Sequence, residues 1–305
     1  MKILFKVKKR QRLRRKQRLS KMKLIKFIFP LIIIPFLLKA QVYSSKDVSV
    51  CKKKFEFAVN KNLKEKPIGD VIAEIGKSFI GTDYAANTLE KGDKEELVIN
   101  LTGLDCTTFL ENALTFARCI KEGKTSFKDY QNNLQKIRYR DGIINGYPSR
   151  LHYFSDWIYD NIKKGIVNDE TKLIGGEKIT FNVNFMSNNP DSYQKLKDNP
   201  ELITEIKKQE KEISSREYYF IPKEKVAEVE NKISNGDLIA ITSNIKGLDV
   251  NHVGIAVRLD DNRIHLMHAP NVGYKVQISK KNLSDYLNNI KKDTGIIVLR
   301  AVNPK

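Results

Sequence analysis

The chain has 305 residues, with 55 Lys and Arg, 36 Asp and Glu, and a formal net charge of +19. Residues 1–40 hold 14 of the basic side chains and no acidic one, so the rest of the chain carries only +5. That remainder has no basic stripe interleaved with aromatic residues, the pattern typical of a nucleic-acid surface. We therefore expect no nucleic-acid partner.

The first 40 residues resemble a targeting segment. A basic stretch ending at Lys26 precedes an apolar run of 12 residues, Phe27 to Leu38, and Lys39-Ala40-Gln41 offers a cleavage site. The run is shorter than the roughly 20 residues of a membrane span. We predict a signal peptide within residues 1–40, starting at Met1 or Met22, and an exported bacterial protein that is periplasmic or secreted. Only this segment, if uncleaved, would touch a membrane.

The N-terminal half of the remainder is predominantly helical by its apolar spacing. We expect a linker over 41–64, a helix over 68–79, a short strand over 97–101 and a helix from Cys106 to about Lys121, ended by Gly123. Within the last of these, Cys119 lies among apolar neighbours and is expected to be a small buried side chain. Three cysteines in an exported chain leave at least one thiol unpaired within a monomer.

The rest of the chain falls into two stretches of different composition. Residues 125–235 are rich in Lys, Asn and Glu, with helical patterns near 127–138, 151–163, 191–212 and 222–230, and little strand-like content except about 177–185. We interpret them as a mostly helical insertion. The last 70 residues predict strands at 237–242, 252–259, 263–269, 275–279 and 294–302, with a helix at 281–290. The order predicts an α+β fold with one catalytic domain over 65–302.

Cys106 is the candidate nucleophile because it stands at a predicted helix start. The unpaired N–H groups and the dipole of a helix N-terminus lower a thiol pKa. Asp105 is suited to be the N-cap, and the backbone N–H of Cys106 could help hold an oxyanion.

Two predicted strands supply histidines for this cysteine. His252 begins the apolar run Val253–Val257 and is the candidate base, and His268 on the next strand could orient it through the other ring nitrogen. His265 lies three residues earlier, so it should face the opposite side of that strand. A metal site formed by the three histidines and Cys106 is the alternative, weakened by the absence of a short-spaced ligand pair. We expect no metal and no other cofactor.

Five elements, in order, resemble the NlpC-type superfamily of papain-like cell-wall cysteine hydrolases. They are Gly81-Thr82-Asp83-Tyr84, Asp105-Cys106, Gly236-Asp237-Leu238-Ile239, His252-Val253-Gly254-Ile255 and Met267-His268-Ala269-Pro270. Asp105–Glu111 and Ser149–Trp157 resemble its AmiA-like branch of N-acetylmuramoyl-L-alanine amidases that prefer anhydro-muropeptides. Ala85-Ala86-Asn87 and Thr107-Thr108 depart from the superfamily pattern, which places a glycine pair and Ser-Gly there.

The resemblance implies a papain-like core in which Cys106 is nucleophile, His252 base and later acid, and His268 the orienting residue. Substrate contacts are expected at Tyr84 and Asp105, beside the nucleophile, and at Arg150, His152 and Asp156. The implied reaction cleaves the amide between N-acetylmuramic acid, in its anhydro form, and L-alanine of peptidoglycan fragments. Two alternatives stay open: an endopeptidase cutting between D-glutamate and the diamino acid, and an inactive wall-binding module.

Overall fold

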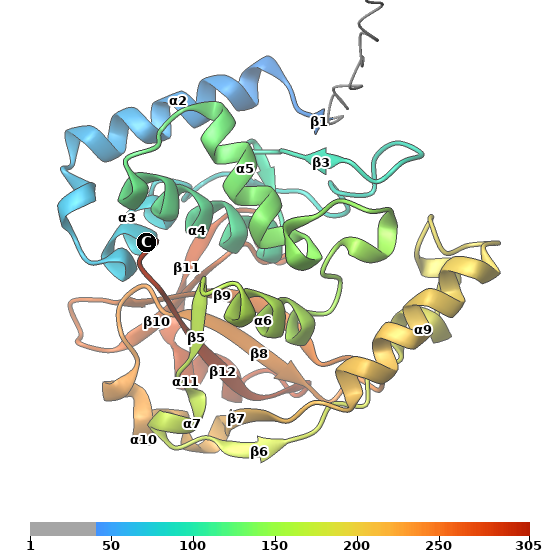
Figure 1. Cartoon of the computed structure of the whole chain (residues 1–305). Helices are drawn as coiled ribbons and strands as arrows, with labels where there is room; N and C mark the ends of the chain where they lie inside the picture. Colours follow the sequence, from blue (N-terminus) through green and yellow to red (C-terminus); the bar gives the residue numbers. More distant parts are fainter. Residues whose placement is uncertain (1–40) are drawn as a thin grey trace, which may run out of the picture. The chain divides into compact units, whose positions relative to one another are not determined.

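A computed structural model describes residues 41–305, and the predicted signal peptide lies outside the described residues. The N-terminal part is helical, as expected (Figure 1). Its elements are β1 (Gln41–Val42), α2 (Ser45–Asn60), η1 (Leu63–Glu65), α3 (Ile68–Lys77), β2 (Asp83–Tyr84), β3 (Leu97–Val98), β4 (Gly103–Leu104), α4 (Cys106–Glu122) and α5 (Phe127–Arg138).

Helix α2 corrects one prediction, because residues 41–64 are not a linker. Ser44 caps the helix with Asp47 in a capping box, and the buried face of α2 carries Cys51, Phe55 and Ala58. The Phe55 ring packs edge-on against Phe116 of α4, with ring centroids 5.1 Å apart. The many lysines of α2 lie on its other side, so in sequence they mask the apolar stripe.

The middle of the chain combines short helices with strands. It contains η2 (Arg140–Gly142), η3 (Tyr147–Ser149), α6 (Phe154–Lys163), β5 (Val167–Asp169), α7 (Thr171–Ile174), β6 (Glu177–Ile179), α8 (Phe185–Asn188), η4 (Pro190–Ser192), α9 (Pro200–Ser214), β7 (Tyr218–Pro222), η5 (Lys223–Lys225), α10 (Val226–Val229) and η6 (Glu230–Lys232). The expected helices are present in part, but β5 and β7 were not predicted. Both pair with β12, so residues 125–235 contribute to the main sheet.

The C-terminal part forms the sheet that the sequence predicts. It consists of β8 (Leu238–Ser243), β9 (Val250–Arg258), β10 (Ile264–His268), β11 (Gln277–Asn282), α11 (Leu283–Asn288) and β12 (Asp293–Ala301). The strand order is β11-β10-β9-β8-β12-β7-β6, with β5 beside β12, and every pairing in this sheet is antiparallel. The α+β prediction is confirmed.

The sheet buries side chains on both faces. Leu238 and Ala240 of β8 join the large core that also contains residues of α2, α3, α4 and α5, whereas Ile239 and Ile241 join a smaller cluster with residues of α7, α10 and α11. Successive strand residues point to opposite faces, which explains the unbroken apolar run of β8.

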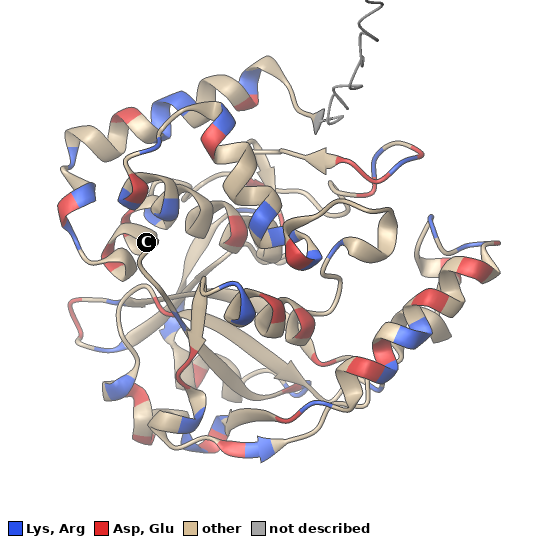
Figure 2. Cartoon of the chain, viewed as in Figure 1, with Lys and Arg blue, Asp and Glu red and all other residues tan. Residues whose placement is uncertain are grey.

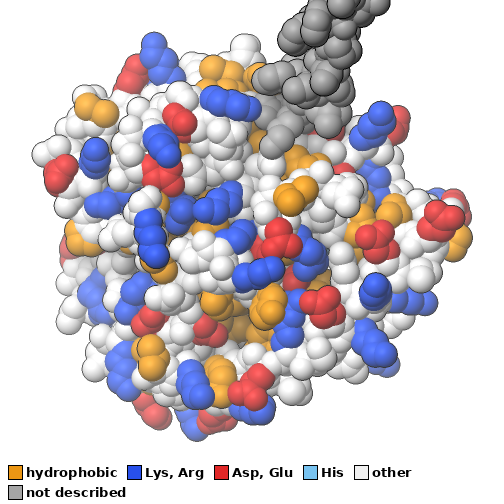
Figure 3. Space-filling model, in the orientation of Figure 1, with side chains coloured by type: hydrophobic (Ala, Val, Ile, Leu, Met, Phe, Trp, Pro, Cys, Tyr) orange, Lys and Arg blue, Asp and Glu red, His pale blue; other side chains and the backbone are white. Residues whose placement is uncertain are grey.

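Figure 2 shows the charged residues mainly on helices and connections, and Figure 3 shows both signs of charge intermixed on one face.

No helix within residues 41–305 combines the length and the apolar character needed to cross a bilayer.

Candidate active site

Cys106 is the first residue of α4, and the chain entering that helix is held by a short parallel strand pair. Asp105 is the N-cap, with its carboxylate accepting hydrogen bonds from the backbone N–H and the hydroxyl of Thr108, both at 2.8 Å. Strand β4, directly before this cap, pairs with β2 and sets Tyr84 opposite Leu104. The expected cap and helix start are therefore present, with Tyr84 close to both.

The two histidines predicted to act together are in contact. His252 Nε2 lies 2.6 Å from His268 Nδ1, and the rings meet edge to face at a centroid distance of 4.9 Å. His265 instead bonds Ser279 through Nδ1 and Asp261 through Nε2. The alternation of strand β10 thus selects His268 as the partner of His252, as its spacing predicts.

A cavity of about 660 Å3 contains Tyr84, Cys106, His252 and His268 in its wall. Its remaining wall comes from the residues after β10, from β11 and from the residues between α11 and β12. Strands β9 and β10 therefore deliver both imidazoles to the cavity into which α4 delivers the thiol. Within residues 41–305, no group of three or more His, Cys, Asp or Glu side chains is arranged to hold a metal ion.

Burial decides the protonation of this site. It raises the pKa of Cys106 to about 11, with a further rise from Asp105, and hydrogen bonds from the backbone of Val253 and from Thr107 lower it by less. Burial also lowers the pKa of His252 to about 3, helped by His268 and Lys292, and that of His268 to about 4. Burial thus acts against the lowering of the thiol pKa that is expected at a helix N-terminus. These shifts favour a neutral thiol and neutral imidazoles.

Most of the chain matches a known family model. The model is described as AmiA-like, N-acetylmuramoyl-L-alanine amidase-like, and it matches residues 74–296. The chain belongs to the AmiA-like family.

Solved structures agree with this assignment. A structure described as an N-acetylmuramoyl-L-alanine amidase from Bacteroides uniformis ATCC 8492 is 40% identical, with 77% of this chain and 99% of that chain covered and a TM-score of 0.74. A putative xylanase from Bacteroides fragilis is 44% identical, with 74% and 98% covered and a TM-score of 0.71. A Legionella pneumophila protein of family DUF1460, at 21% identity, shares the fold, with 85% and 96% covered and a TM-score of 0.65. No curated protein is significantly similar to the chain.

Two motifs of this AmiA-like chain have structural explanations. Gly236 has a φ of +83°, and a Cβ there would collide with the backbone of Gly69. The next residue, Asp237, is buried and binds Arg300 through both carboxylate oxygens, at 2.9 and 2.8 Å. At Gly254, a Cβ would lie 2.8 Å from the carbonyl oxygen of Met267. Gly236 thus lets the turn before β8 approach α3, and Gly254 lets β9 approach β10, the two strands that carry the histidines.

The structure does not bring Arg150 to this cavity. Its side chain is buried and forms ion pairs with Glu90 at 2.6 Å and Glu95 at 3.3 Å. Arg150 thus ties its own segment to the loop before β3, and both of its carboxylate partners come from the protein itself.

His152 and Asp156 also lie outside the residues that line the cavity. His152 is half-buried, its Nε2 lies 2.9 Å from the carbonyl oxygen of Tyr147, and burial lowers its pKa to about 3. Asp156 is buried and bridges Arg140 at 2.6 Å and Arg216 at 2.7 Å. Asp105 is engaged in the helix cap and does not line the cavity either. Of the five expected substrate contacts, Tyr84 alone lines it.

The lining residues that were not predicted include Asn251, Tyr286, Lys292 and Asp293. Asn251 could have been found, since it directly precedes His252 in the same strand. The other three come from α11, the turn after it and the start of β12, which are distant in sequence from the two histidine motifs. Tyr286 meets His268 edge to face at 5.4 Å and so covers the orienting imidazole.

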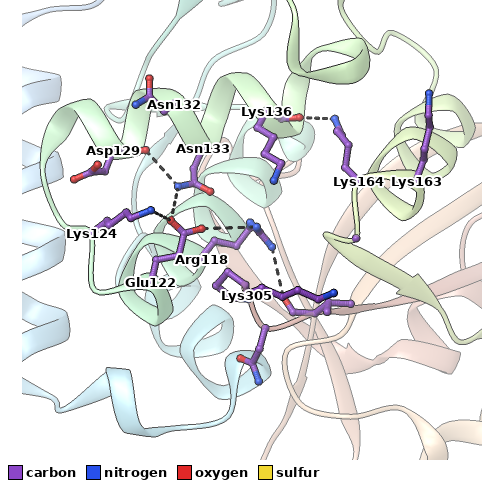
Figure 4. A pocket seen from close by; sticks show the side chains of 14 residues that line it. Arg118, Glu122, Lys124, Asp129, Asn132, Asn133, Lys136, Lys163, Lys164 and Lys305 are labelled. Atoms are coloured by element: carbon purple, nitrogen blue, oxygen red, sulfur yellow. Dashed lines mark hydrogen bonds and ion pairs between the residues drawn. The ribbon is translucent and has the colours of Figure 1, made fainter.

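A second cavity, of about 640 Å3, lies at the other end of α4 (Figure 4). The carboxylate of Glu122 lies between Arg118 and Lys124, with nitrogen–oxygen distances of 3.8 and 3.7 Å. The described residues that line it include no Cys, His or Ser, so this cavity offers ion-paired charge and no nucleophile.

Proposed function

We propose that this chain hydrolyses the amide bond between the lactyl group of N-acetylmuramic acid, in its anhydro form, and L-alanine in peptidoglycan fragments. Membership of the AmiA-like family and the name of the Bacteroides uniformis structure support the reaction class. The observation that carries the mechanism is the His252–His268 contact at 2.6 Å in the wall of the cavity that also contains Cys106.

The proposed mechanism places the His252 proton on Nε2. With the proton on Nε2, His252 donates to His268 Nδ1, and its own Nδ1 keeps a lone pair. Nδ1 is then the nitrogen that takes the proton of the Cys106 thiol. Because both groups are neutral at rest, the proton moves as the sulfur attacks, which is general-base catalysis.

The reaction then runs in two stages. Cys106 Sγ bonds to the lactyl carbonyl carbon, the thiol proton passes to His252 Nδ1, and the oxyanion faces the backbone N–H of Cys106 at the helix start. As the carbon–nitrogen bond breaks, His252 gives that proton to the alanine nitrogen, and a free peptide leaves. Water, deprotonated by His252, cleaves the thioester, releasing the lactyl carboxylate and restoring the thiol. His268 supports the imidazolium that forms at each stage.

The signal-like segment of residues 1–40 supports action outside the cytoplasm, in the periplasm or after secretion, where such fragments are generated.

The test is product analysis by mass spectrometry on a defined anhydro-muropeptide. The wild-type chain should release the intact stem peptide, and Cys106→Ala should release none while its circular dichroism spectrum and melting temperature stay close to wild type. His265→Asn is the matched control and should retain activity. Release of a peptide that begins at the diamino acid, with L-alanyl-D-glutamate retained on the anhydro-muramic acid, would assign the endopeptidase instead, and no turnover by wild type would indicate a wall-binding module. Loss of activity on chelation alone would refute the cysteine mechanism.

A further inference from the structure

Asn251 lines the catalytic cavity and carries an unpaired acceptor. It lies beside the base, and its Oδ1 is buried without a hydrogen-bond partner among the described residues. A buried acceptor left unpaired costs free energy. A substrate N–H that reaches Oδ1 would recover that free energy.

The orientation of this amide is determined by its neighbour. Asn251 Nδ2 donates to Asp293 Oδ1 at 2.9 Å, and Asp293 is buried. A carboxylate accepts only from the NH2 group, so the amide cannot turn over without placing two acceptors together. The oxygen is thereby held as the free end, and Asn251 can only accept from a ligand at that position.

The same cavity has an excess of positive charge. Lys280, Lys281 and Lys292 line it with a single carboxylate, that of Asp293. Among the described residues, none of the three ammonium groups has an ion-pair partner within 4.0 Å. Lys292 is near enough to His252 to lower the pKa of that imidazole, so this charge lies close to the reacting centre.

We propose that this part of the cavity binds the peptide side of the substrate, with Asn251 Oδ1 accepting a backbone N–H and the three lysines binding a peptide carboxylate. The inference rests on the proposed function. In a muramoyl peptide the lactyl carboxyl is consumed by the scissile amide, so the sugar side is neutral. The peptide side carries an N–H at each residue and the D-glutamate carboxylate that is not amide-bonded to the diamino acid. The chain would thus select an acidic leaving peptide.

Affinity measured without turnover tests this separately from catalysis. Two fragments are titrated calorimetrically into the Cys106→Ala variant of the full chain: 1,6-anhydro-N-acetylmuramoyl-L-alanyl-D-glutamate and its diamide, which differ only in the peptide carboxylates. The dicarboxylate should bind roughly tenfold more tightly, as expected for a charge-assisted contact. Equal affinities, or tighter binding of the diamide, would overturn the proposal.

Variants then assign the contacts. Adding Lys280→Met, Lys281→Met and Lys292→Met should remove the preference for the dicarboxylate, whereas Lys291→Met, an exposed neighbour outside the cavity wall, should preserve it. Asn251→Ala should weaken both fragments alike, by roughly tenfold, because it removes an acceptor and no charge. A preference that survives the triple lysine change would refute the lysine contact. Failure of the wild type to cleave either fragment, with the affinity ratio intact, would count against the proposed function alone.

Discussion

Replacing His268 tests the link between the two imidazoles most directly. His268 is 2% exposed and its Nδ1 is the partner of His252 Nε2 at 2.6 Å. In His268→Ala, the imidazolium that forms on His252 during the reaction loses this partner. A hydrogen bond to a charged group contributes about 1.5–3 kcal/mol, and about 1.4 kcal/mol corresponds to tenfold. We therefore expect kcat to fall by roughly 10- to 100-fold, with KM little changed.

The assay is steady-state release of the stem peptide, with kcat and KM determined separately. His268→Asn is the diagnostic companion, because Asn Oδ1 stands near the position of His Nδ1 and can accept the same hydrogen bond. It should restore most of the kcat that His268→Ala loses. His265→Asn controls for changes on strand β10 and should leave kcat unaltered. If His268→Ala keeps its kcat while folded, or if His268→Asn is as slow as His268→Ala, the orienting role is refuted.

Three further predictions concern protonation and packing. Since burial holds the pKa of His252 near 3, kcat/KM should stay level from pH 7 to pH 5 and fall only below about pH 4, whereas a fall centred near pH 6.5 would contradict that shift. His268 has a pKa of about 4 in the fold and 6.5 when exposed, so the unfolded chain takes the proton first, and the free energy of unfolding should decrease as pH falls from 6.5 to 4 in urea titrations. Phe55→Ala should lower the free energy of unfolding of the catalytic domain, measured in urea, by about 3–5 kcal/mol. An unchanged free energy of unfolding would be the result expected if residues 41–64 were a linker.

Local chemistry made most of the fold predictable. Helix α4 begins at an Asp cap and ends at Gly123 with a φ of +70°, and both signals stand in the sequence next to a wide apolar stripe. The strands β8, β9 and β10 could also be predicted, because each contains an uninterrupted run of buried, mostly apolar residues. Strand β7 was not predictable in this way, since its pairing with β12 is decided by residues more than 70 positions away. Helix α2 was missed because its exposed lysines dominate its composition.

In the candidate site, too, residues could be predicted where a local pattern places them and could not where distant segments decide their contacts. His268 could be preferred over His265 from strand alternation alone, because period 2 is a local property. The polar residues Arg150 and Asp156 carried no such signal, since the carboxylates and guanidinium groups that engage them come from distant segments. A charged residue in a family motif is thus ambiguous in sequence between substrate binding and a buried ion pair, and here the ion pairs account for both.

The protonation of Cys106 shows why enclosure must be known before reactivity can be assigned. A helix N-terminus stabilises a thiolate by about 0.3–1 kcal/mol at an exposed position, and this much can be anticipated from a cap followed by a cysteine. Enclosure by β9 and the cavity wall acts in the opposite direction and raises the pKa to about 11. Alkylation by iodoacetamide should therefore accelerate steadily from pH 7 to pH 10 in the free enzyme, with no plateau near neutrality. A plateau below pH 7 would show a preformed thiolate–imidazolium pair and would replace the general-base step by attack of a resident thiolate.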